Sequence, residues 1–324
     1  MKHIELLNIA ATAAFLLFGA TTASAGPVYN FTTIDSPAAL FGTYLGGINN
    51  AGDMVGDASV GASGASLRNS GFLLAGGSFL TINPAGSHST VLTAINNSGD
   101  ISGHYESTVC CSTPRVGFGR LASGAVTVID LAPHVSTTAN GINDAGTIVG
   151  DAYLAGSPFS GFIKDSSGTH PFNAPGGLST HIYGINNSGD FVGQAGERGF
   201  LDHAGIFSFL DIPGAILTVA TALNNDDTVV GYFVDSAGLQ HGFKFSGGAY
   251  QTLDDPLGLN SYLTGINDRG QIVGNYSDGR VQHGFIAQSV PEPASWAMLL
   301  GGLGLLAARR VSRGHQFRYF DGSV

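Results

Sequence analysis

Short apolar stretches alternate with turns rich in Gly, Asn and Pro along most of the 324-residue chain. This alternation is typical of β-strands that are joined by tight turns. One phrase recurs six times and reads, in its third copy, Gly141-Ile-Asn-Asp-Ala-Gly-Thr-Ile-Val-Gly150. The Asn side chain can hydrogen-bond to the backbone two residues on, and the Gly supplies a positive φ angle at no steric cost. Each copy therefore predicts a hairpin with a structural turn asparagine.

The spacing of these phrases predicts a repeated structural unit, which cannot bury its apolar face alone. The leading asparagines lie 47, 47, 43, 38 and 43 residues apart and are Asn49, Asn96, Asn143, Asn186, Asn224 and Asn267. After each hairpin comes a Gly-Phe pair, which indicates a third strand, and most copies add a fourth strand that ends near a Pro. Four short strands in this length are typical of a propeller blade, whereas the rungs of a β-helix, the alternative fold, are usually shorter.

The two ends of the repeat region complement each other. The sixth copy lacks a fourth strand after Gly284-Phe285, and a segment with the pattern of a fourth strand, Tyr29–Pro37, precedes the first copy. We expect Tyr29–Ile34 to pair with Gly284–Gln288, because this closes the ring and removes both open sheet edges. The sequence thus predicts an all-β, six-bladed β-propeller over residues 26–290.

A second glycine recurs inside the second strand of every copy, where glycine normally weakens a strand. These glycines are Gly56, Gly103, Gly150, Gly193, Gly231 and Gly274. We expect the Phe of the third strand to lie across this bare backbone, which is a packing role.

Residues 1–25 have the order of parts of a secretory signal peptide. Lys2 is followed by an apolar region from Ile9 to Ala20 and by the cleavage pattern Ala23-Ser-Ala25, which places the mature start at Gly26. The apolar region is too short for a stable transmembrane helix. The sequence therefore predicts an exported protein.

Charge and cysteine content narrow the range of partners. Residues 26–290 contain 8 Lys and Arg against 20 Asp and Glu, with no basic cluster, so nucleic-acid binding is not expected. The two cysteines, Cys110 and Cys111, are adjacent and have no metal-ligand spacing around them. In an oxidising compartment they could form a strained vicinal disulfide, remain free, or pair with another molecule.

The C-terminal segment combines a Pro-rich break, an apolar stretch from Ala294 to Ala308 and a positive end. This order closely resembles the PEP-CTERM sorting signal of Gram-negative bacteria. The matching residues are Pro291, Glu292, Pro293, Arg309 and Arg310. The resemblance implies a precursor that a transmembrane helix holds in the membrane, with the Arg pair on the cytoplasmic side, until an exosortase-type membrane protease cuts near the Pro-Glu-Pro motif. The alternative is a permanent membrane anchor.

The expected domains are therefore a signal peptide at 1–25, the propeller at 26–290, the sorting segment at 291–310 and a polar extension at 311–324. Such signals usually end soon after the basic cluster, so the extension is a departure from the pattern. The repeats themselves resemble HAF-type extracellular repeats, with His241-Gly-Phe243 and His283-Gly-Phe285 as the best matches to the second phrase of that family. This resemblance implies an exported protein and brings no catalytic residues.

The Asn-Asn-x-Gly-Asp turn has a passing likeness to an oxygen-rich calcium loop. Its carboxylate is not repeated: Asp53, Asp100 and Asp190 occupy the fifth position in three copies, and Thr147, Thr228 and Gln271 occupy it in the others. The Asn recurs in all six copies, so we expect structural turns without calcium and no cofactor.

No catalytic constellation is evident in the sequence. The histidines show no paired metal spacing, and His241 and His283 are interpreted as strand packing. The acidic pairs Asp226-Asp227 and Asp254-Asp255 are expected in turns, without burial. Two carboxylates could still converge at the ring centre from different blades and act on a glycoside.

The expected function is a non-catalytic binding or structural module, exported to the cell surface or extracellular matrix and associated with exopolysaccharide. The alternative is an extracellular carbohydrate-active enzyme with its site on one propeller face. A deep axial pocket with clustered carboxylates and aromatic side chains would favour the enzyme, and a ring of repeated small side chains would favour the structural role.

Overall fold

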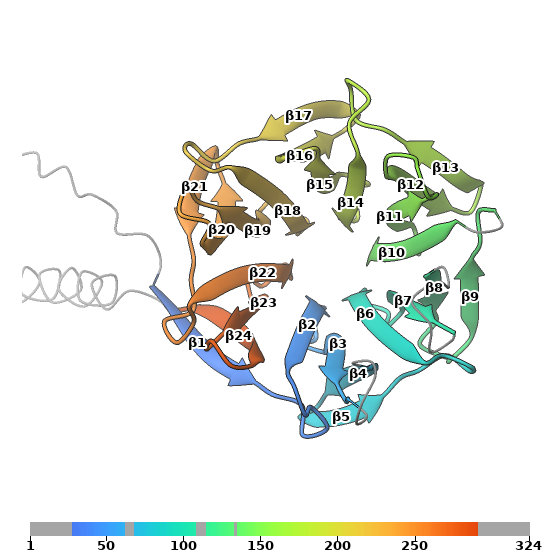
Figure 1. The fold of residues 1–324 in the computed structure, drawn as a ribbon, viewed down its shortest axis with the longest axis horizontal. Helices are drawn as coiled ribbons and strands as arrows, with labels where there is room; N and C mark the ends of the chain where they lie inside the picture. The colour runs from blue at the N-terminus through green and yellow to red at the C-terminus, as the bar shows by residue number, and fades with distance from the viewer. Residues whose placement is uncertain (1–27, 62–67, 108–114, 133–134, 291–324) are drawn as a thin grey trace, which may run out of the picture.

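The structure, a computed structural model, describes residues 28–61, 68–107, 115–132 and 135–290, and every regular element in these ranges is a strand. The 24 strands in these ranges form six four-stranded antiparallel sheets. The sheets stand around a central axis as the blades of a propeller (Figure 1). The all-β, six-bladed fold expected from the repeat is therefore confirmed.

Every blade has the same order of strands from the axis outward. The innermost strands are β2 (Thr43–Ile48), β6 (Ser89–Ile95), β10 (Ser136–Ile142), β14 (Thr180–Ile185), β18 (Leu217–Leu223) and β22 (Asn260–Ile266). The second strands are β3 (Met54–Ser59), β7 (Ile101–Glu106), β11 (Ile148–Tyr153), β15 (Phe191–Ala195), β19 (Val229–Val234) and β23 (Ile272–Ser277).

The outer half of each blade carries the Gly-Phe phrase and the fourth strand. The third strands are β4 (Asn69–Ala75), β8 (Val116–Arg120), β12 (Ser160–Asp165), β16 (Arg198–His203), β20 (Gln240–Ser246) and β24 (Gln282–Val290). The outermost strands are β5 (Ser78–Thr81), β9 (Val126–Ile129), β13 (Gly168–Phe172), β17 (Ile206–Leu210), β21 (Ala249–Thr252) and, in the sixth blade, β1 (Val28–Ile34).

The sixth blade joins the two ends of the described chain. β1 pairs antiparallel with β24, so that Val28 lies opposite Val290 and Ile34 opposite Gly284. The Phe31 ring packs against the Phe285 ring, with 5.4 Å between their centroids. The predicted closure of the ring by the N-terminal strand is confirmed, and the pairing extends beyond the predicted ranges by one residue in β1, to Val28, and by two residues in β24, to Val290.

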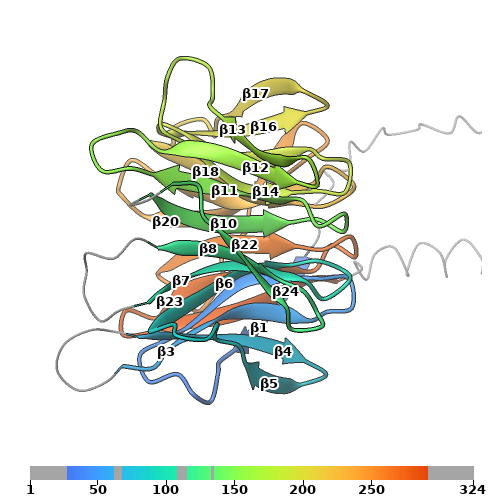
Figure 2. The ribbon, with the colours of Figure 1, turned by 90° about the vertical axis from the view of Figure 1, so that its right-hand side faces the viewer.

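The chain ends and the Asn turns lie on the same face of the ring. Each innermost strand runs toward its Asn turn, and Figure 2 shows β10 pointing to that side. β24 runs in the direction of β22, because both are antiparallel to β23, so Val290 lies at this face. β1 runs the opposite way and therefore begins here, at Val28. We call this side the turn face and the opposite side the mouth face.

Every innermost strand carries a β-bulge at the same position. A bulge adds one residue and re-aims its side chain. The extra residues are Gly46, Thr93, Asn140, Tyr183, Thr221 and Thr264. These six positions line the central channel described below.

The hydrophobic core lies between neighbouring blades, as expected for an array. Val273 of the sixth blade, for example, packs into one cluster with Leu45 and Phe72 of the first. A Cβ on Gly150 would overlap the Thr138 carbonyl oxygen and come within 2.8 Å of the Phe162 ring. The expected Phe-on-Gly packing is confirmed in five blades, at Gly103, Gly150, Gly193, Gly231 and Gly274.

Candidate functional site

The six leading asparagines form the turns that the sequence predicts. In the third blade, Asn143 Oδ1 accepts hydrogen bonds from the backbone N–H groups of Ala145 (3.1 Å) and Thr147 (3.0 Å). The other five asparagines make the same pair of bonds to the residues two and four positions on. These asparagines are 3–6% exposed, so their polar atoms are satisfied within the protein.

The same asparagines also connect the blades. Each Nδ2 donates to the backbone oxygen of the leading asparagine in the next blade, over 2.9–3.5 Å, and the sixth bond returns to the first blade. We call this closed circle the inner asparagine ring. Sequence analysis predicted the turn role of these residues and missed their bonds between blades.

A second circle of hydrogen bonds surrounds the turn-face end of the axis. The N–H of the residue after each leading asparagine donates to the side-chain oxygen of its counterpart in the next blade, over 2.8–2.9 Å. Its members are Asn50, Asn97, Asp144, Asn187, Asn225 and Asp268. Burial opposes ionisation of Asp144, but hydrogen bonds from Asn97 and Asn187 outweigh it and hold the pKa of this carboxyl below its usual value. We call this circle the outer polar ring.

Carboxylates at the fifth turn position bond to groups of the protein. Asp190 accepts from the Ala204 N–H at 2.8 Å and lies 3.0 Å from His203 Nδ1. Asp190, His203 and Asp227 form the one three-residue group in the described ranges whose ligand atoms lie within 4.8 Å of one another. Asp227 has a φ of 56°, in keeping with its place at the position where the other turns have Gly. These bonds account for the carboxylates as structural groups, and the absence of calcium stays a prediction.

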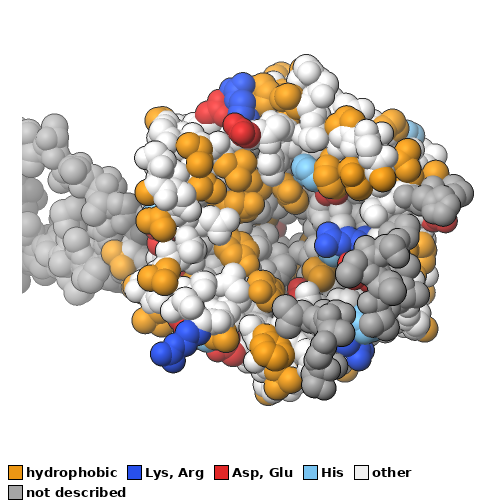
Figure 3. Space-filling view, viewed as in Figure 1, with side chains coloured by type: hydrophobic (Ala, Val, Ile, Leu, Met, Phe, Trp, Pro, Cys, Tyr) orange, Lys and Arg blue, Asp and Glu red, His pale blue; other side chains and the backbone are white. Residues whose placement is uncertain are grey.

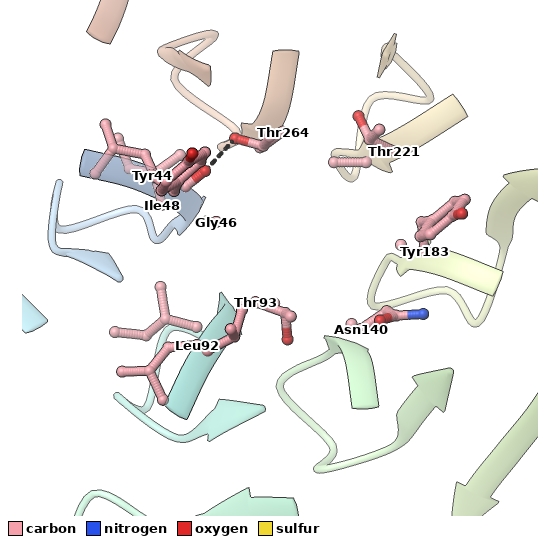
Figure 4. A pocket seen from close by; sticks show the side chains of 18 of the residues that line it. Tyr44, Gly46, Ile48, Leu92, Thr93, Asn140, Tyr183, Thr221 and Thr264 are labelled. Atoms are coloured by element: carbon pink, nitrogen blue, oxygen red, sulfur yellow. Dashed lines mark hydrogen bonds between the residues drawn. The ribbon is translucent and has the colours of Figure 1, made fainter. Parts of the chain in front are cut away.

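The innermost strands line the axial channel in layers. Next to the asparagine rings lies an aliphatic layer of Ile48, Ile95, Ile142, Ile185, Leu223 and Ile266. The bulge residues form the next layer toward the mouth face and line the channel. Thr93, Asn140, Thr221 and Thr264 each donate to a backbone oxygen of the next blade, over 2.6–2.9 Å, and Figure 4 shows the Thr264 bond. The Tyr183 ring lines both the channel and the adjoining cavity.

The layer nearest the mouth face differs from blade to blade. The residue after each recurring strand glycine is Asp57, His104, Asp151, Gln194, Tyr232 or Asn275. Asp57 and Asn275 line the channel, and His104 and Asp151 line an adjoining cavity. Gln194 lies 3.5 Å from the Tyr183 hydroxyl, and the Tyr232 ring packs on the ring of Tyr262. We call these six residues the variable layer.

Asp57 is one of two members of this layer with an unpaired buried polar atom; the other is His104. Asp57 is 4% exposed, and its Oδ2 has no hydrogen-bond partner among the described residues. Burial raises the pKa of Asp57 to about 8. The carboxyl is therefore largely protonated at neutral pH, and it can both donate and accept a hydrogen bond.

Tyr44 and Tyr183 lie on opposite sides of the channel (Figure 4). Tyr44 lies directly opposite Asp57 in the ladder between β2 and β3. Tyr183 begins a row of four neighbouring rings that continues through His181 and Phe159 to Tyr153. The distances between successive ring centroids are 5.9, 4.3 and 4.6 Å. Burial, Asp151 and Tyr232 raise the pKa of Tyr183, so its hydroxyl stays protonated.

Asp151 holds this row of rings in place. Its carboxylate accepts from Thr138 Oγ1 (2.8 Å) and Asn140 Nδ2 (2.7 Å) and lies 3.4 Å from His181 Nδ1. In the same cavity, His104 Nδ1 is buried without a partner among the described residues. Burial and the nearby Arg115 lower the pKa of His104 to about 4, which leaves its ring neutral.

Two connected cavities result. The channel cavity has a volume of about 450 Å³, the adjoining one has about 520 Å³, and Asn140 and Tyr183 line both. Figure 3 shows the mouth face hollowed at its centre, with apolar side chains around the hollow. The channel volume lies within the range of small-molecule sites.

One expectation about charged groups needs correction, and another is extended. Asp255 was expected in an exposed turn, but it is 2% exposed, because its backbone and carboxyl both close the turn into β22. His241 and His283 do stack on Phe233 and Tyr276, as packing predicts. Their Nδ1 atoms also lie 2.7 Å from Asp254 and 2.9 Å from Asp35, so each bridges two strands.

Sequence reasoning missed the variable layer, although the sequence holds a signal for it. The phrase recurs up to the strand glycine, and the next residue then differs in nearly every copy. The sorting residues, the signal peptide, the apolar C-terminal helix and the cysteine pair lie outside the described residues. Within the described ranges, no helix is long and apolar enough to cross a bilayer.

Comparison with known proteins identifies one segment of the chain. Residues 289–313, which contain all five predicted sorting residues, match the PEP-CTERM protein-sorting motif. This motif indicates an exported protein that is held at the membrane until exosortase, a membrane protease, processes it. No curated protein matches the chain.

Two solved structures show a partial likeness to this chain. TolB from Acinetobacter baumannii is 14% identical, with a TM-score of 0.49 over 76% of this chain and 63% of that one. AofleA from Arthrobotrys oligospora is 12% identical, with a TM-score of 0.48 over 81% of this chain and 90% of that one. At such identities the likeness concerns the fold alone, and no ligand or activity is carried over.

Proposed function

We propose that this chain is a non-catalytic binding module of the cell surface or extracellular matrix, which attaches to a neutral saccharide of the exopolysaccharide through the mouth of its channel. The PEP-CTERM motif supports export and release from the membrane. The proposal includes the assignment of the repeats to the HAF-type extracellular class, on the phrases quoted above.

The variable layer is the observation that carries this proposal. Turn asparagines, strand glycines and buried phenylalanines recur in all six copies, because each blade needs them in order to pack. The residue after the strand glycine has no packing role shared by the six blades, and its identity differs between copies. It lies near the mouth face, where the two cavities are. Divergence at a single layer of a repeated scaffold supports a ligand site there.

The lining of the channel favours a neutral, hydroxyl-rich ligand. Among the described residues that line it, none is Lys or Arg, so an anionic ligand would lack a counter-charge. Tyr44, Tyr183 and Tyr262 offer rings for the apolar face of a sugar, and their hydroxyls stay protonated because burial raises the pKa of each. Asp57 adds a carboxyl group at the same level, whereas both polar atoms of the Asn275 amide are bonded to the backbone of Leu45.

The direction of the mouth supports the same role. Val28 and Val290 both lie at the turn face, so the sorting segment is attached on the side opposite the mouth. While the sorting segment lies in the membrane, the cavity therefore opens away from the point of attachment. A ligand outside the cell can reach it before and after processing.

A glycan array tests the proposal. The fragment 26–290 contains every strand of the ring, and we expect it to bind neutral saccharides. Tyr183→Ala should lose this binding, and Asp130→Ala, which changes an exposed residue on the outer rim of blade 2, should keep it. Absence of binding to any saccharide, or binding that survives Tyr183→Ala, would refute the proposed site.

A glycan-active enzyme is the second candidate, and the state of Asp57 favours it. A carboxyl whose pKa is raised to about 8 has the protonation that a general acid needs, and Asp151 supplies a second carboxyl at the same level of the mouth. Release of reducing ends from the bound saccharide, lost in Asp57→Asn, would establish the enzyme. Binding without release over long incubation would establish the binding module.

A further inference from the structure

The channel is open at the mouth face and constricted at the turn face. Its space falls from about 450 Å³ in the upper cavity to about 80 Å³ between the asparagine rings. The aliphatic layer separates the two spaces, and in five blades its side chains are at most 9% exposed. A space of about 80 Å³ holds a few water molecules and is too small for a sugar ring.

This constriction is fixed by the fold. The inner asparagine ring joins each blade to the next and closes on itself, from Asn267 Nδ2 to the Asn49 carbonyl oxygen at 2.9 Å. The outer polar ring repeats the closure from the Asp268 N–H to Asn50 Oδ1, also at 2.9 Å. Widening the floor would break bonds in both circles and leave buried polar groups unpaired, which is costly.

Near the mouth, Asp57 lines the upper cavity, and its buried Oδ2 has no hydrogen-bond partner among the described residues. The hydroxyls of Thr93, Thr221 and Thr264 below it are already bonded to backbone oxygens. Tyr44 and Tyr183 face the space from opposite sides. The arrangement suits a single ring-shaped group that enters from the mouth, lies between the two tyrosines and bonds to Asp57.

We infer that the site takes the end of a neutral saccharide chain and not its interior, an inference that rests on the proposed saccharide-binding function. A chain cannot thread through the channel, because the floor does not admit a sugar ring. An interior residue has neighbours on both sides and cannot enter a blind cavity, whereas a terminal residue has a neighbour on one side only.

The test measures how many binding sites a given mass of saccharide presents. The probe is the neutral exopolysaccharide of the producing bacterium, partially hydrolysed with acid and separated by size. Isothermal titration of each fraction with the mature protein gives the number of sites per gram. End recognition predicts that halving the mean chain length doubles the sites per gram, with the affinity of each site unchanged.

Other outcomes separate this inference from the function on which it rests. A number of sites per gram that does not depend on chain length would mean binding along the chain, which overturns end recognition and leaves the binding module standing. Absence of heat or binding with every fraction would overturn both.

Two variants tie the result to the cavity. Tyr183→Phe keeps the ring and should keep end binding, whereas Tyr183→Ala should weaken it about tenfold or more. Asp57→Ala removes the carboxyl and should also weaken binding, and Asp130→Ala is the matched control on the outer rim. Thermal melting of each variant shows that the fold is intact. Equal affinity in Tyr183→Ala and the parent would place the bound end elsewhere and overturn the inference.

Discussion

Asn267 donates a hydrogen bond from Nδ2 to the backbone oxygen of Asn49 over 2.9 Å, although 218 residues separate them in the chain. The other five bonds of the inner asparagine ring connect the blades in order from the first to the sixth. This bond connects the sixth blade to the first and closes the circle. The same amide lies 2.9 Å from Gln271 Oε1, so the turn and the circle share one side chain. A single residue type thus contributes both to the local hairpin and to the closed circle of bonds between blades.

The turn asparagines should therefore be costly to replace. Asn96→Ala removes three bonds within its turn and one to the third blade, and we expect a loss of about 1–3 kcal/mol in the free energy of unfolding. Ser98→Ala in the same turn changes an exposed side chain and should stay within about 0.5 kcal/mol. Urea denaturation measures both. The loss should be the same with calcium and with a chelator, and a calcium-dependent loss would point to a metal site.

Removal of the N-terminal strand should destabilise the whole ring. Deleting residues 26–37 exposes the edge of β24 and takes Phe31 and Ile34 out of their packing clusters. We expect a lower melting temperature, partly restored when a synthetic peptide of residues 26–37 is added. An unchanged melting temperature would show that ring closure by β1 contributes nothing to stability.

The protonated state of Asp57 should be visible in the pH dependence of stability. The folded protein keeps this proton up to about pH 8, whereas the unfolded chain releases it near 3.8. The folded state binds more protons between these values, so the contribution of Asp57 to the free energy of unfolding falls as the pH rises through this window. Asp57→Asn should show a smaller fall.

The effect of Asp57 on the free energy of unfolding is best measured between pH 6.5 and about 8. His104, whose pKa is lowered to about 4 from 6.5, acts in the opposite direction, and its effect is largely complete below this range. Denaturant unfolding of the parent and of Asp57→Asn at several pH values gives the difference. Parallel curves would mean that Asp57 is ionised in the folded protein.

Processing should leave a mature protein that begins at Gly26 and ends near Val290. The sorting motif starts where β24 ends, so a cut at Pro-Glu-Pro removes no strand of the ring. Intact-mass analysis of native surface or secreted protein tests this expectation. Recovery only of a species that still contains Trp296 and residues 311–324 would show that the tail is a permanent anchor.

The blade and the closed ring could be predicted because their causes are local and repeated. An Asx turn needs one Asn and one Gly at fixed positions, and six copies of that pair reveal the period. The missing fourth strand after Phe285 and the spare strand before Asn49 then indicate closure without any knowledge of packing.

The site could not be predicted in the same way. The bulges at Thr93 and its counterparts shift the alternation of the innermost strands by one residue, so a simple period of two does not show which side chains face the axis. That Tyr183 lies across from Tyr44 depends on the position of the fourth blade relative to the first. The unpaired oxygen of Asp57 is a property of its surroundings, which the residue type does not reveal.

The pairing of β1 with β24 also sets an order of events during export. β1 can pair only after β24 has been made. The sixth blade is therefore completed after the other five. Contacts between residues so distant in sequence form slowly, because the intervening chain must first be brought into a loop. During export the ring therefore closes only after β24, its last strand, has been delivered, so the complete fold is the final product of export and not its starting point.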